Sequence, residues 1–447
     1  MDISEWRTKN SKVKSYAHFD KRVSVGNDFV WNYITNPENI SRHGFYPFIA
    51  HTQNLRKYKN DNGKDVIIPK ERPICYSAHI DRCIFQYYSF LLNQIYNDRV
   101  AADDINSVAI AYRNNLTNQN NITFAKKAID YIKLSGDCFV MIGDFSSFFD
   151  NLDHNYLKRR LCDLLGVDLL PSDYYAVFKN VIRYSEWDIN DLLEINGLEK
   201  NSKGIRELNK RETVLSTEDF KKHKKQYLKR NVKCGIPQGS AISAVLANIY
   251  MLDADKQINN FVKSFGGLYM RYSDDFIIIL PKITGSVFDE AYKWIMTFYK
   301  NMPGVVLSPE KTKIYHYQEQ TINYYTTKDT KEAPSGKPQI NFLGFSFDGK
   351  SVSIRAKAIS KYYYRLHKKA KVIVDNGFIS PTGKRISCRN LYMLYSCKGA
   401  KPEGKHKGNF ITYVNRAYRI FNNDEAIKIP VRKHMRKIRK ALNKLKS

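Results

Sequence analysis

Cysteine and long apolar runs are both scarce in this chain of 447 residues. The seven cysteines are odd in number, scattered, and never spaced as C-x-x-C, so neither a disulfide framework nor a structural zinc site is expected. No apolar run is long enough to span a membrane, and the N-terminal sequence MDISEWRTKN lacks the profile of a signal peptide. We therefore expect a reduced, cytoplasmic protein without a membrane partner, long enough for two or three domains.

Acidic residues are scarce relative to basic ones, and the imbalance lies at one end of the chain. The formal net charge is +29. Residues 351–447 carry 25 Lys and Arg against 4 Asp and Glu, whereas residues 1–350 carry 48 against 40. A plain solvated basic surface would account for the charge, but aromatic side chains that can stack on bases are interleaved with it: Tyr362, Tyr363, Tyr364 and Tyr392. The C-terminal segment is therefore predicted to bind nucleic acid.

The stretch RYSDDFIIIL, residues 271–280, places two adjacent carboxylates between apolar runs. Both flanks are rich in aromatic and aliphatic residues, which predicts two short strands, and Gly266-Gly267 suits the turn before the first one. Asp274 and Asp275 then lie at the tip of a hairpin, where their oxygens suit a hard divalent cation such as Mg²⁺. Ser-Asp-Asp is equally ordinary in a solvated turn, so the interpretation depends on another carboxylate from elsewhere in the chain.

Such a carboxylate follows the apolar run CFVMI, residues 138–142. The run predicts a buried strand, and Asp144 closes it. A charge at that point is unfavourable unless it is paired or bound to a metal, although a capping aspartate is the simpler alternative. Five residues later stands Phe149, a bulky ring of the kind that can exclude a 2′-hydroxyl from a nucleotide site.

Cationic side chains at two places in the chain suit phosphate chemistry. In VIIPKERPICY, residues 66–76, Lys70 and Arg72 are two apart and so face the same way in a strand, where they can hold a triphosphate. A charged, exposed edge strand is the alternative. Lys311 follows a turn in LSPEKTKI, residues 307–314. It is either an ordinary solvated lysine or, beside a polymerising site, a proton donor to leaving pyrophosphate.

The sequence CGIPQGSAISAVLANIYM, residues 234–251, combines a tight loop with a helix. Gly235, Pro237 and Gly239 constrain the loop that holds Gln238, and apolar residues from Ile242 onward recur at helical spacing. The small residues at its start allow a base pair or a ribose to approach closely. A glycine loop before a helix also suits phosphate, but that signal alone is weak.

The remaining segments predict the framework around these motifs. Residues 1–60 are polar, and we expect a few short helices there. Apolar periodicity and stop signals predict helices at residues 80–95, 122–134, 155–165 and 285–301. Residues 189–230 read as a charged insertion that contains a helix, for binding a template, binding a partner, or merely facing solvent. Asp348-Gly349 predicts a hairpin within residues 339–355, and the chain beyond is basic and helical.

The order of these motifs, over residues 66–350, resembles that of the reverse transcriptase family. RPI with Lys70 and Arg72 resembles the fingers. DFSSFFD resembles motif A, GIPQGSAISAVLANIYM resembles motif B, and YSDD resembles motif C. Lys311 resembles the motif D lysine, and FLGF resembles the primer-grip hairpin. The resemblance implies an α+β right-hand polymerase. Its expected parts are an N-terminal helical extension (1–65), fingers and palm (66–350) and a basic helical thumb (351–447).

The resemblance also implies a mechanism, two-metal nucleotidyl transfer. Asp144, Asp274 and Asp275 would hold two Mg²⁺ ions about 3.5 to 4 Å apart, with Mn²⁺ as an alternative. Phe149 falls at the steric-gate position, which favours dNTPs. Lys70, Arg72, Gln238 and Gly239 fall at substrate-binding positions. RNA-dependent RNA polymerases also carry acidic pairs, but they usually have an acidic residue where Phe149 stands.

Within the family, the chain is most similar to the defence-associated lineages of bacteria, the abortive-infection and unknown groups. It has no retron-like NAxxH or VTG stretch, no cysteine-rich endonuclease tail, and no RNase H or integrase constellation. The similarity implies anti-phage defence, with a noncoding RNA as template, DNA as product and oligomers as one option. Template-independent or protein-primed synthesis is the alternative within the family. A catalytically inactive RNA-binding scaffold is the alternative outside enzymes.

Overall fold

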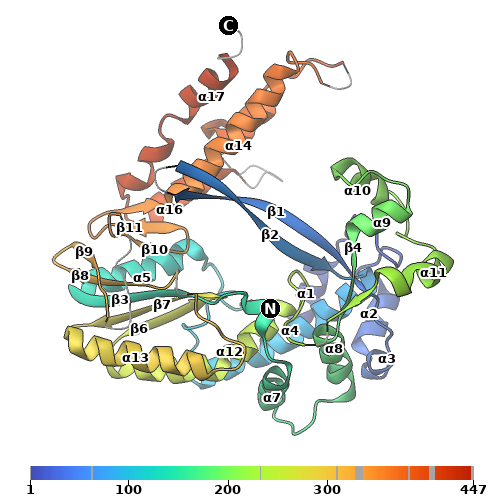
Figure 1. Ribbon diagram of the computed structural model, residues 1–447, viewed down its shortest axis with the longest axis horizontal. Helices are drawn as coiled ribbons and strands as arrows, with labels where there is room; N and C mark the ends of the chain where they lie inside the picture. The colour runs from blue at the N-terminus through green and yellow to red at the C-terminus, as the bar shows by residue number, and fades with distance from the viewer. Residues whose placement is uncertain are drawn as a thin grey trace.

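The computed structural model describes residues 2–61, 64–231, 233–308, 311–327, 336–380, 383–401 and 408–443, with the backbone alone for residues 54–70. At its centre is an antiparallel five-stranded sheet of order β6-β7-β3-β8-β9 (Figure 1). Its strands are β3 (Asp137–Asp144), β6 (Leu268–Tyr272), β7 (Asp275–Pro281), β8 (Lys313–Gln318) and β9 (Thr321–Tyr324). The predicted strand before Asp144 and the predicted hairpin around Asp274 are thus both present, as neighbours in one sheet.

Both faces of this sheet are covered, as the continuous apolar character of β3 and β7 requires. Phe139 and Met141 belong to the core formed with α12 (Ser243–Ser264) and α13 (Gly285–Asn301). The alternate residues Cys138 and Val140 belong to the core formed with α5 (Asn121–Ser135). Figure 1 shows α13 and α5 on opposite sides of the strands. A slab covered on both faces holds the strand ends rigidly.

A second sheet, of order β2-β1-β4-β5, contains the predicted cationic strand. β1 (Phe48–Asp61) and β2 (Lys64–Tyr76) pair antiparallel along their whole length and form a long ribbon (Figure 1). β1 replaces part of the polar segment for which only short helices were expected. The hairpin also crosses the boundary expected at residue 65. β4 (Ser185–Asp188) pairs with β1, and β5 (Lys229–Arg230) pairs with β4.

Helices pack around the two sheets. All four predicted helices are present, as α4 (His79–Ala102), α5, α7 (His154–Leu165) and α13. The other helices before residue 230 are α1 (Ile3–Asn10), α2 (Asp28–Thr35), α3 (Pro37–Ser41), α6 (Phe148–Asn151), α8 (Ser172–Ile182), α9 (Ile189–Ile195), α10 (Ser202–Leu208) and α11 (Thr217–Tyr227). The insertion thus contains three helices rather than one, and they pack on a small core around Trp187 and Leu192 that also includes Ile49 of β1. Among the described helices, none combines the length and the apolar character needed to cross a membrane.

The C-terminal region begins with a small three-stranded sheet and continues as helices. The strands are β10 (Ile340–Phe342), β11 (Phe345–Phe347) and β12 (Val352–Ile354), and the helices are α14 (Ala356–Asp375), α15 (Arg389–Tyr395), α16 (Phe410–Ile420) and α17 (His434–Asn443). The expectation that Tyr362 and Tyr363 stack on bases was wrong. They are only 5% and 8% exposed, because they fill the core between α14 and its neighbours. Tyr364 is 52% exposed on the other side of α14.

Candidate active site

Three carboxylates meet where β3 ends and β7 begins. Asp144 is the last residue of β3 and is the direct cross-strand partner of Asp275, the first residue of β7. Asp274 lies in the tight connection from β6 to β7, after Ser273, whose φ is +61°. The connection is fixed to β3, because the amide of Phe145 donates to the carbonyl of Asp274 at 3.0 Å. The fold therefore brings together the carboxylates that the sequence predicted from positions 130 residues apart (144 and 274).

The electrostatics of this cluster follow from its crowding. Partial removal from water, followed by the negative charges of Asp274 and Asp144, raises the pKa of Asp275 to about 7. The ammonium of Lys311 forms an ion pair with Oδ1 of Asp144 and opposes part of that rise. Lys311 reaches Asp144 because the preceding loop is anchored by the amide of Ser308, which donates to the carbonyl of Asp144 at 2.8 Å. The predicted motif D lysine is therefore part of the carboxylate cluster.

The cluster is not preformed as a metal cage. Among the described residues, no group of three or more His, Cys, Asp or Glu side chains is arranged closely enough to hold an ion. Lys311 pairs with only one of the three carboxylates, so the cluster carries excess negative charge of the kind that a divalent cation neutralises. Carboxylate oxygens are also the donors that Mg²⁺ prefers. The residues therefore fit a divalent ion in donor chemistry and charge.

The glycine loop of residues 235–239 is held by backbone hydrogen bonds to two other motifs. Its amides at Gly235 and Ile236 donate to carbonyls of Leu152 and Phe149, both at 2.8 Å. On its other side, the amide of Cys75 in β2 donates to the carbonyl of Gln238 at 2.7 Å. The loop therefore joins the segment after Asp144 to the cationic strand.

Glycine is required within this loop on two grounds. Gly239 has φ +108°, and a Cβ there would lie 2.5 Å from the carbonyl oxygen of Cys75.

Next to Gly239, the side-chain amide of Gln238 donates to Oδ1 of Asp150 at 3.0 Å. Asp150 was not among the predicted site residues. This contact orients Gln238 beside Phe149, a partly buried ring of α6.

The two cations of the cationic strand β2 differ in what the structure describes of them. Arg72 is exposed in β2, opposite Gln53 of β1, and is three residues before the strand's contact with the glycine loop. Lys70 occupies the expected register, opposite Leu55, but its side chain lies outside the described residues. The expectation that both cations hold a triphosphate stays a prediction.

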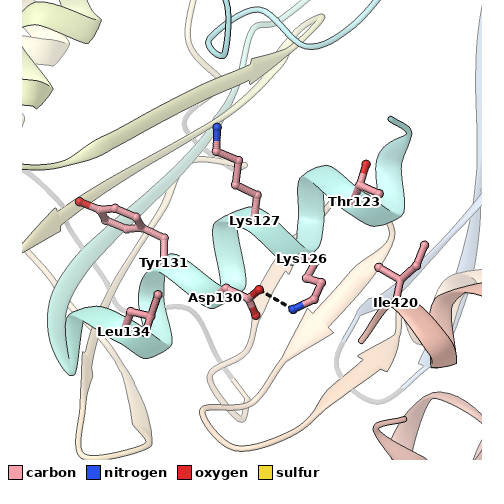
Figure 2. A pocket seen from close by; sticks show the side chains of 7 residues that line it. All are labelled: Thr123, Lys126, Lys127, Asp130, Tyr131, Leu134 and Ile420. Carbon is pink, nitrogen blue, oxygen red and sulfur yellow. Dashed lines mark hydrogen bonds and ion pairs between the residues drawn. The ribbon is translucent and has the colours of Figure 1, made fainter. Parts of the chain in front are cut away.

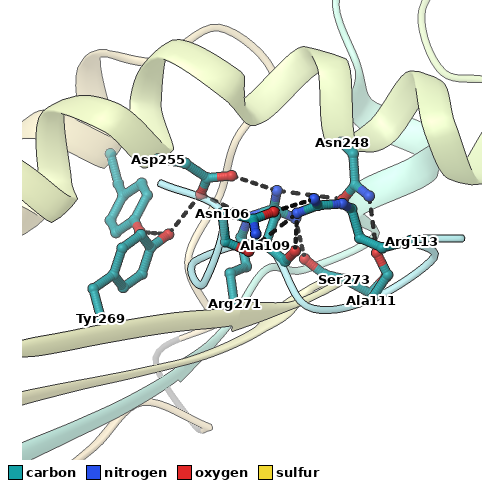
Figure 3. A network of polar contacts seen from close by, with 10 residues as sticks. Asn106, Ala109, Ala111, Arg113, Asn248, Asp255, Tyr269, Arg271 and Ser273 are labelled. Carbon is teal, nitrogen blue, oxygen red and sulfur yellow. Dashed lines mark hydrogen bonds and ion pairs between the residues drawn. The ribbon is translucent and has the colours of Figure 1, made fainter. Parts of the chain in front are cut away.

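A buried polar network behind the carboxylates was missed by the sequence reasoning. Arg271 and Asp255 are 0% and 1% exposed at the side chain and form an ion pair between β6 and α12 (Figure 3). Burial disfavours the Arg271 cation, but the Asp255 carboxylate outweighs burial and raises the Arg271 pKa above its usual value. The signal in the sequence was Asp255 itself, a charge at the helical spacing of the apolar residues Leu252 and Ile258 in the helix that follows the glycine loop.

A surface hollow on α5 is separate from this cluster. Figure 2 shows it on the outer side of the helix, against Ile420 of α16. Its lining consists of Thr123, Lys126, Lys127, Asp130, Tyr131, Leu134 and Ile420. None of these is a predicted site residue, and the Lys126–Asp130 ion pair satisfies two of its charges. The chemistry therefore lies at the strand ends rather than in this hollow.

Comparison with known proteins agrees with the motif order. Residues 59–347 match the family described as "Reverse transcriptase (RNA-dependent DNA polymerase)". The chain belongs to the reverse transcriptase family, and its domain is that of a nucleotidyltransferase with the right-hand polymerase fold. No curated protein matches the chain significantly.

Among solved structures, similar chains include two fungal telomerases. Apo telomerase from Candida tropicalis, truncated from its C-terminal domain, is 16% identical, with a TM-score of 0.40 and coverage of 78% of this chain and 64% of that chain. Telomerase from Candida albicans in complex with a TWJ fragment of telomeric RNA is 12% identical, with a TM-score of 0.42 and coverage of 95% and 67%. The chain thus spans about 64% of the length of the first of these relatives.

Proposed function

We propose that this protein is an RNA-directed DNA polymerase whose reaction centre is formed by Asp144, Asp274 and Asp275. The observation that carries the proposal is the cross-strand pairing of Asp144 with Asp275, with Asp274 in the adjoining turn. Family membership supports the reaction class. Retention of all three carboxylates and of Lys311 argues against the alternative of an inactive RNA-binding scaffold.

The three carboxylates would hold the divalent ions, with Mg²⁺ as the first choice. Bound ions supply activation of the primer 3′-hydroxyl and neutralisation of phosphate charge. The residues of the chain supply the rest. Asp144 and Asp275 are kept opposite each other by the ladder, and Lys311, which pairs with Asp144, would donate a proton to leaving pyrophosphate. With Asp144 holding an ion, the ammonium of Lys311 would be less tightly paired with that carboxylate and would be available for this role.

The nucleotide would lie between the carboxylates and the glycine loop. Gly239 leaves room for close approach of a base pair or ribose, and Arg72 offers a guanidinium to phosphates. Phe149 is held beside this loop by the hydrogen bond between its carbonyl and the amide of Ile236. A ring at that point excludes a 2′-hydroxyl by steric contact, which favours dNTPs over NTPs.

Loss of one carboxylate tests the reaction centre. Purified protein with Mg²⁺, dNTPs and a primed RNA template should synthesise DNA, and Asp274→Ala should abolish synthesis. Glu290→Ala, which removes an exposed acid from α13, is the matched control and should retain wild-type activity. Equal product from Asp274→Ala and the wild type would reject the assignment.

RNA is proposed to contact the exposed face of α14. Lys361 and Lys368 are two helical turns apart on that face, and no ion pair among the described residues involves them. Lys361→Glu with Lys368→Glu should weaken RNA binding about tenfold and reduce its salt dependence. The same charge change on α13, Lys293→Glu with Lys300→Glu, should leave both unchanged. A flat salt response in the wild type would remove α14 from the RNA surface.

We further propose a role in bacterial anti-phage defence, in the cytoplasm, with a noncoding RNA as template. The support is the resemblance of the motif set and basic helical C-terminal region to defence-associated reverse transcriptases. Expression in a susceptible bacterium should lower phage plating, and Asp274→Ala should restore it. Sequencing of the copurifying nucleic acid separates templated synthesis from the alternative of template-independent or protein-primed synthesis, because only the former yields DNA complementary to one RNA.

A further inference from the structure

The catalytic turn is held from behind by one fully buried guanidinium. Arg271 donates from Nε to Oδ1 of Asp255 at 2.8 Å and from Nη2 to Oδ2 at 2.6 Å. Its remaining nitrogen, Nη1, donates to the carbonyl of Ser273 at 2.9 Å. Both side chains of the pair are at most 1% exposed. The guanidinium therefore joins α12 directly to the peptide that precedes Asp274.

Arg271 is fixed in turn by the segment that connects α4 to α5. Its backbone amide donates to Val108 at 2.8 Å, and its carbonyl accepts from Ile110 at 2.9 Å. This segment thus lies along the free edge of β6, next to the turn. Asn248 of α12 completes the arrangement. Its Oδ1 accepts from Nη2 of Arg271 at 3.4 Å, and its side-chain amide donates to the carbonyl of Ala111 at 2.9 Å (Figure 3).

The conformation of the turn shows why an anchor is needed. Ser273 has φ +61°, which a residue other than glycine adopts at a cost. Nothing in the local sequence enforces that conformation. Two hydrogen bonds over-determine it, one from Arg271 to the Ser273 carbonyl and one from the Tyr112 hydroxyl to Ser273 Oγ at 3.2 Å. Tyr112 itself has φ +61°, so the strain is shared by both partners.

Stability alone does not account for this ion pair. A buried pair is often no more stabilising than well-packed apolar side chains of similar volume, so its retention points to orientation. We propose that Arg271 is a positioning residue, held by Asp255 and Asn248, that fixes the Ser273–Asp274 peptide so that Asp274 and Asp275 face Asp144. The inference rests on the proposed role of these carboxylates.

An apolar replacement of the whole pair separates orientation from stability. Arg271→Met with Asp255→Leu removes both charges together and leaves no unpaired ion. We expect a melting temperature near that of the wild type. We expect kcat to fall about 10- to 100-fold, because small displacements of reacting groups reduce the rate strongly. The Mg²⁺ midpoint, which is the Mg²⁺ concentration that gives half-maximal activity, should rise, and KM for dNTP should be nearly unchanged.

The matched control makes the same kind of change away from the turn. Tyr88 donates to the buried carboxylate of Asp173 at 2.7 Å, so Tyr88→Phe with Asp173→Leu also removes a buried polar pair. It should leave kcat per folded molecule unchanged, whatever its effect on the melting temperature. The proposal would be overturned if Arg271→Met with Asp255→Leu had the wild-type kcat and Mg²⁺ midpoint. It would also be overturned if the loss of activity in this variant were no larger than its loss of folded protein.

A second variant keeps the test decisive if the first does not fold. Arg271→Lys retains a cation for Asp255 but removes the fork that also reaches Ser273. It should keep the fold and lose kcat, and wild-type kcat would count against positioning. Asp274→Ala is assayed in parallel, because activity in that protein rejects the reaction centre itself, whereas inactivity there with full activity in Arg271→Lys rejects the positioning role alone.

Discussion

Asp144 and Asp275 are direct partners at the end of the β3–β7 ladder, so two carboxylates stand where most cross-strand pairs would avoid like charges. The ladder cannot separate them without losing its register, which buried residues on both faces specify. The repulsion is therefore built into the fold. A proton, Lys311 or a bound metal ion would each relieve it, and these three would compete.

This competition predicts a pH dependence of stability without metal. The folded-state pKa of Asp275 is about 7, above its ordinary value of 3.8. A carboxyl with a raised folded pKa binds its proton more tightly in the folded chain, so stability falls as pH rises from about 4 to about 7. Asp275→Asn lacks this titration. In EDTA, its melting temperature should exceed that of the wild type by about 1 to 4 °C at pH 8 and by less at pH 5.

Mg²⁺ should reverse the order of the melting temperatures of the wild type and Asp275→Asn in the same experiment. At pH 8, Mg²⁺ should raise the melting temperature of the wild type more than that of Asp275→Asn, because the ion binds the ionised carboxylates. Glu290→Asn is the matched control and should follow the wild type at every pH. Equal melting curves for Asp275→Asn and the wild type in EDTA at pH 8 would show that the repulsion is absent.

Gly143 permits β3 and β7 to pair closely. A Cβ at this position would lie 2.2 Å from Cζ of Phe276, its cross-strand partner. Gly143→Ala should therefore lower the free energy of unfolding by about 1 to 3 kcal/mol or displace the strands, with loss of activity. Gly44→Ala is the control, because Gly44 is exposed with nothing within 4 Å of its Cβ position. Chemical denaturation measures both, and equal midpoints would contradict the prediction.

The carboxylate cluster was predictable because each member interrupts an apolar run. Asp144 ends a strand that is buried on both faces, and Asp274 and Asp275 divide two others. The chemistry of single positions and the motif order were enough to place them together. Four helices were predictable for the same reason, since their apolar periodicity is strong.

Other features depend on contacts that no local pattern records. Arg271 reads as an ordinary strand residue, and its burial depends on Asp255 from a separate helix. β1 is polar along much of its length and forms a strand because β2 pairs with it. Tyr362 and Tyr363 looked available to bases because they stand among lysines, but helical geometry turns them toward the core. In each case tertiary partners decided what the sequence left open.

Gly239 couples the glycine loop to the cationic strand. An alanine there combines an unfavourable φ of +108° with a Cβ 2.5 Å from the carbonyl oxygen of Cys75. Gly239→Ala should therefore move the loop away from β2, raise KM for dNTP and lower kcat, about 10-fold or more in kcat/KM. Gly336→Ala is the control, because Gly336 carries a comparable φ of +97° with nothing within 4 Å of its Cβ position. Wild-type kinetics in Gly239→Ala, or an equal loss in the control, would contradict the role given to the contact with Cys75.

Phe149 is predicted to set the choice of sugar. Phe149→Ala should raise the ratio of kcat/KM for NTPs to that for dNTPs by about 10- to 100-fold, because the clash with the 2′-hydroxyl disappears. Single-nucleotide incorporation with matched dNTP and NTP measures this ratio. Phe149→Leu retains part of the volume and should give an intermediate ratio, which distinguishes a steric gate from a general loss of order. Phe149 also packs against the core, so melting temperatures must accompany the kinetics. If Phe149→Ala is stable and keeps the wild-type ratio, the sugar does not lie against Phe149. The glycine loop would then be the segment that selects the sugar.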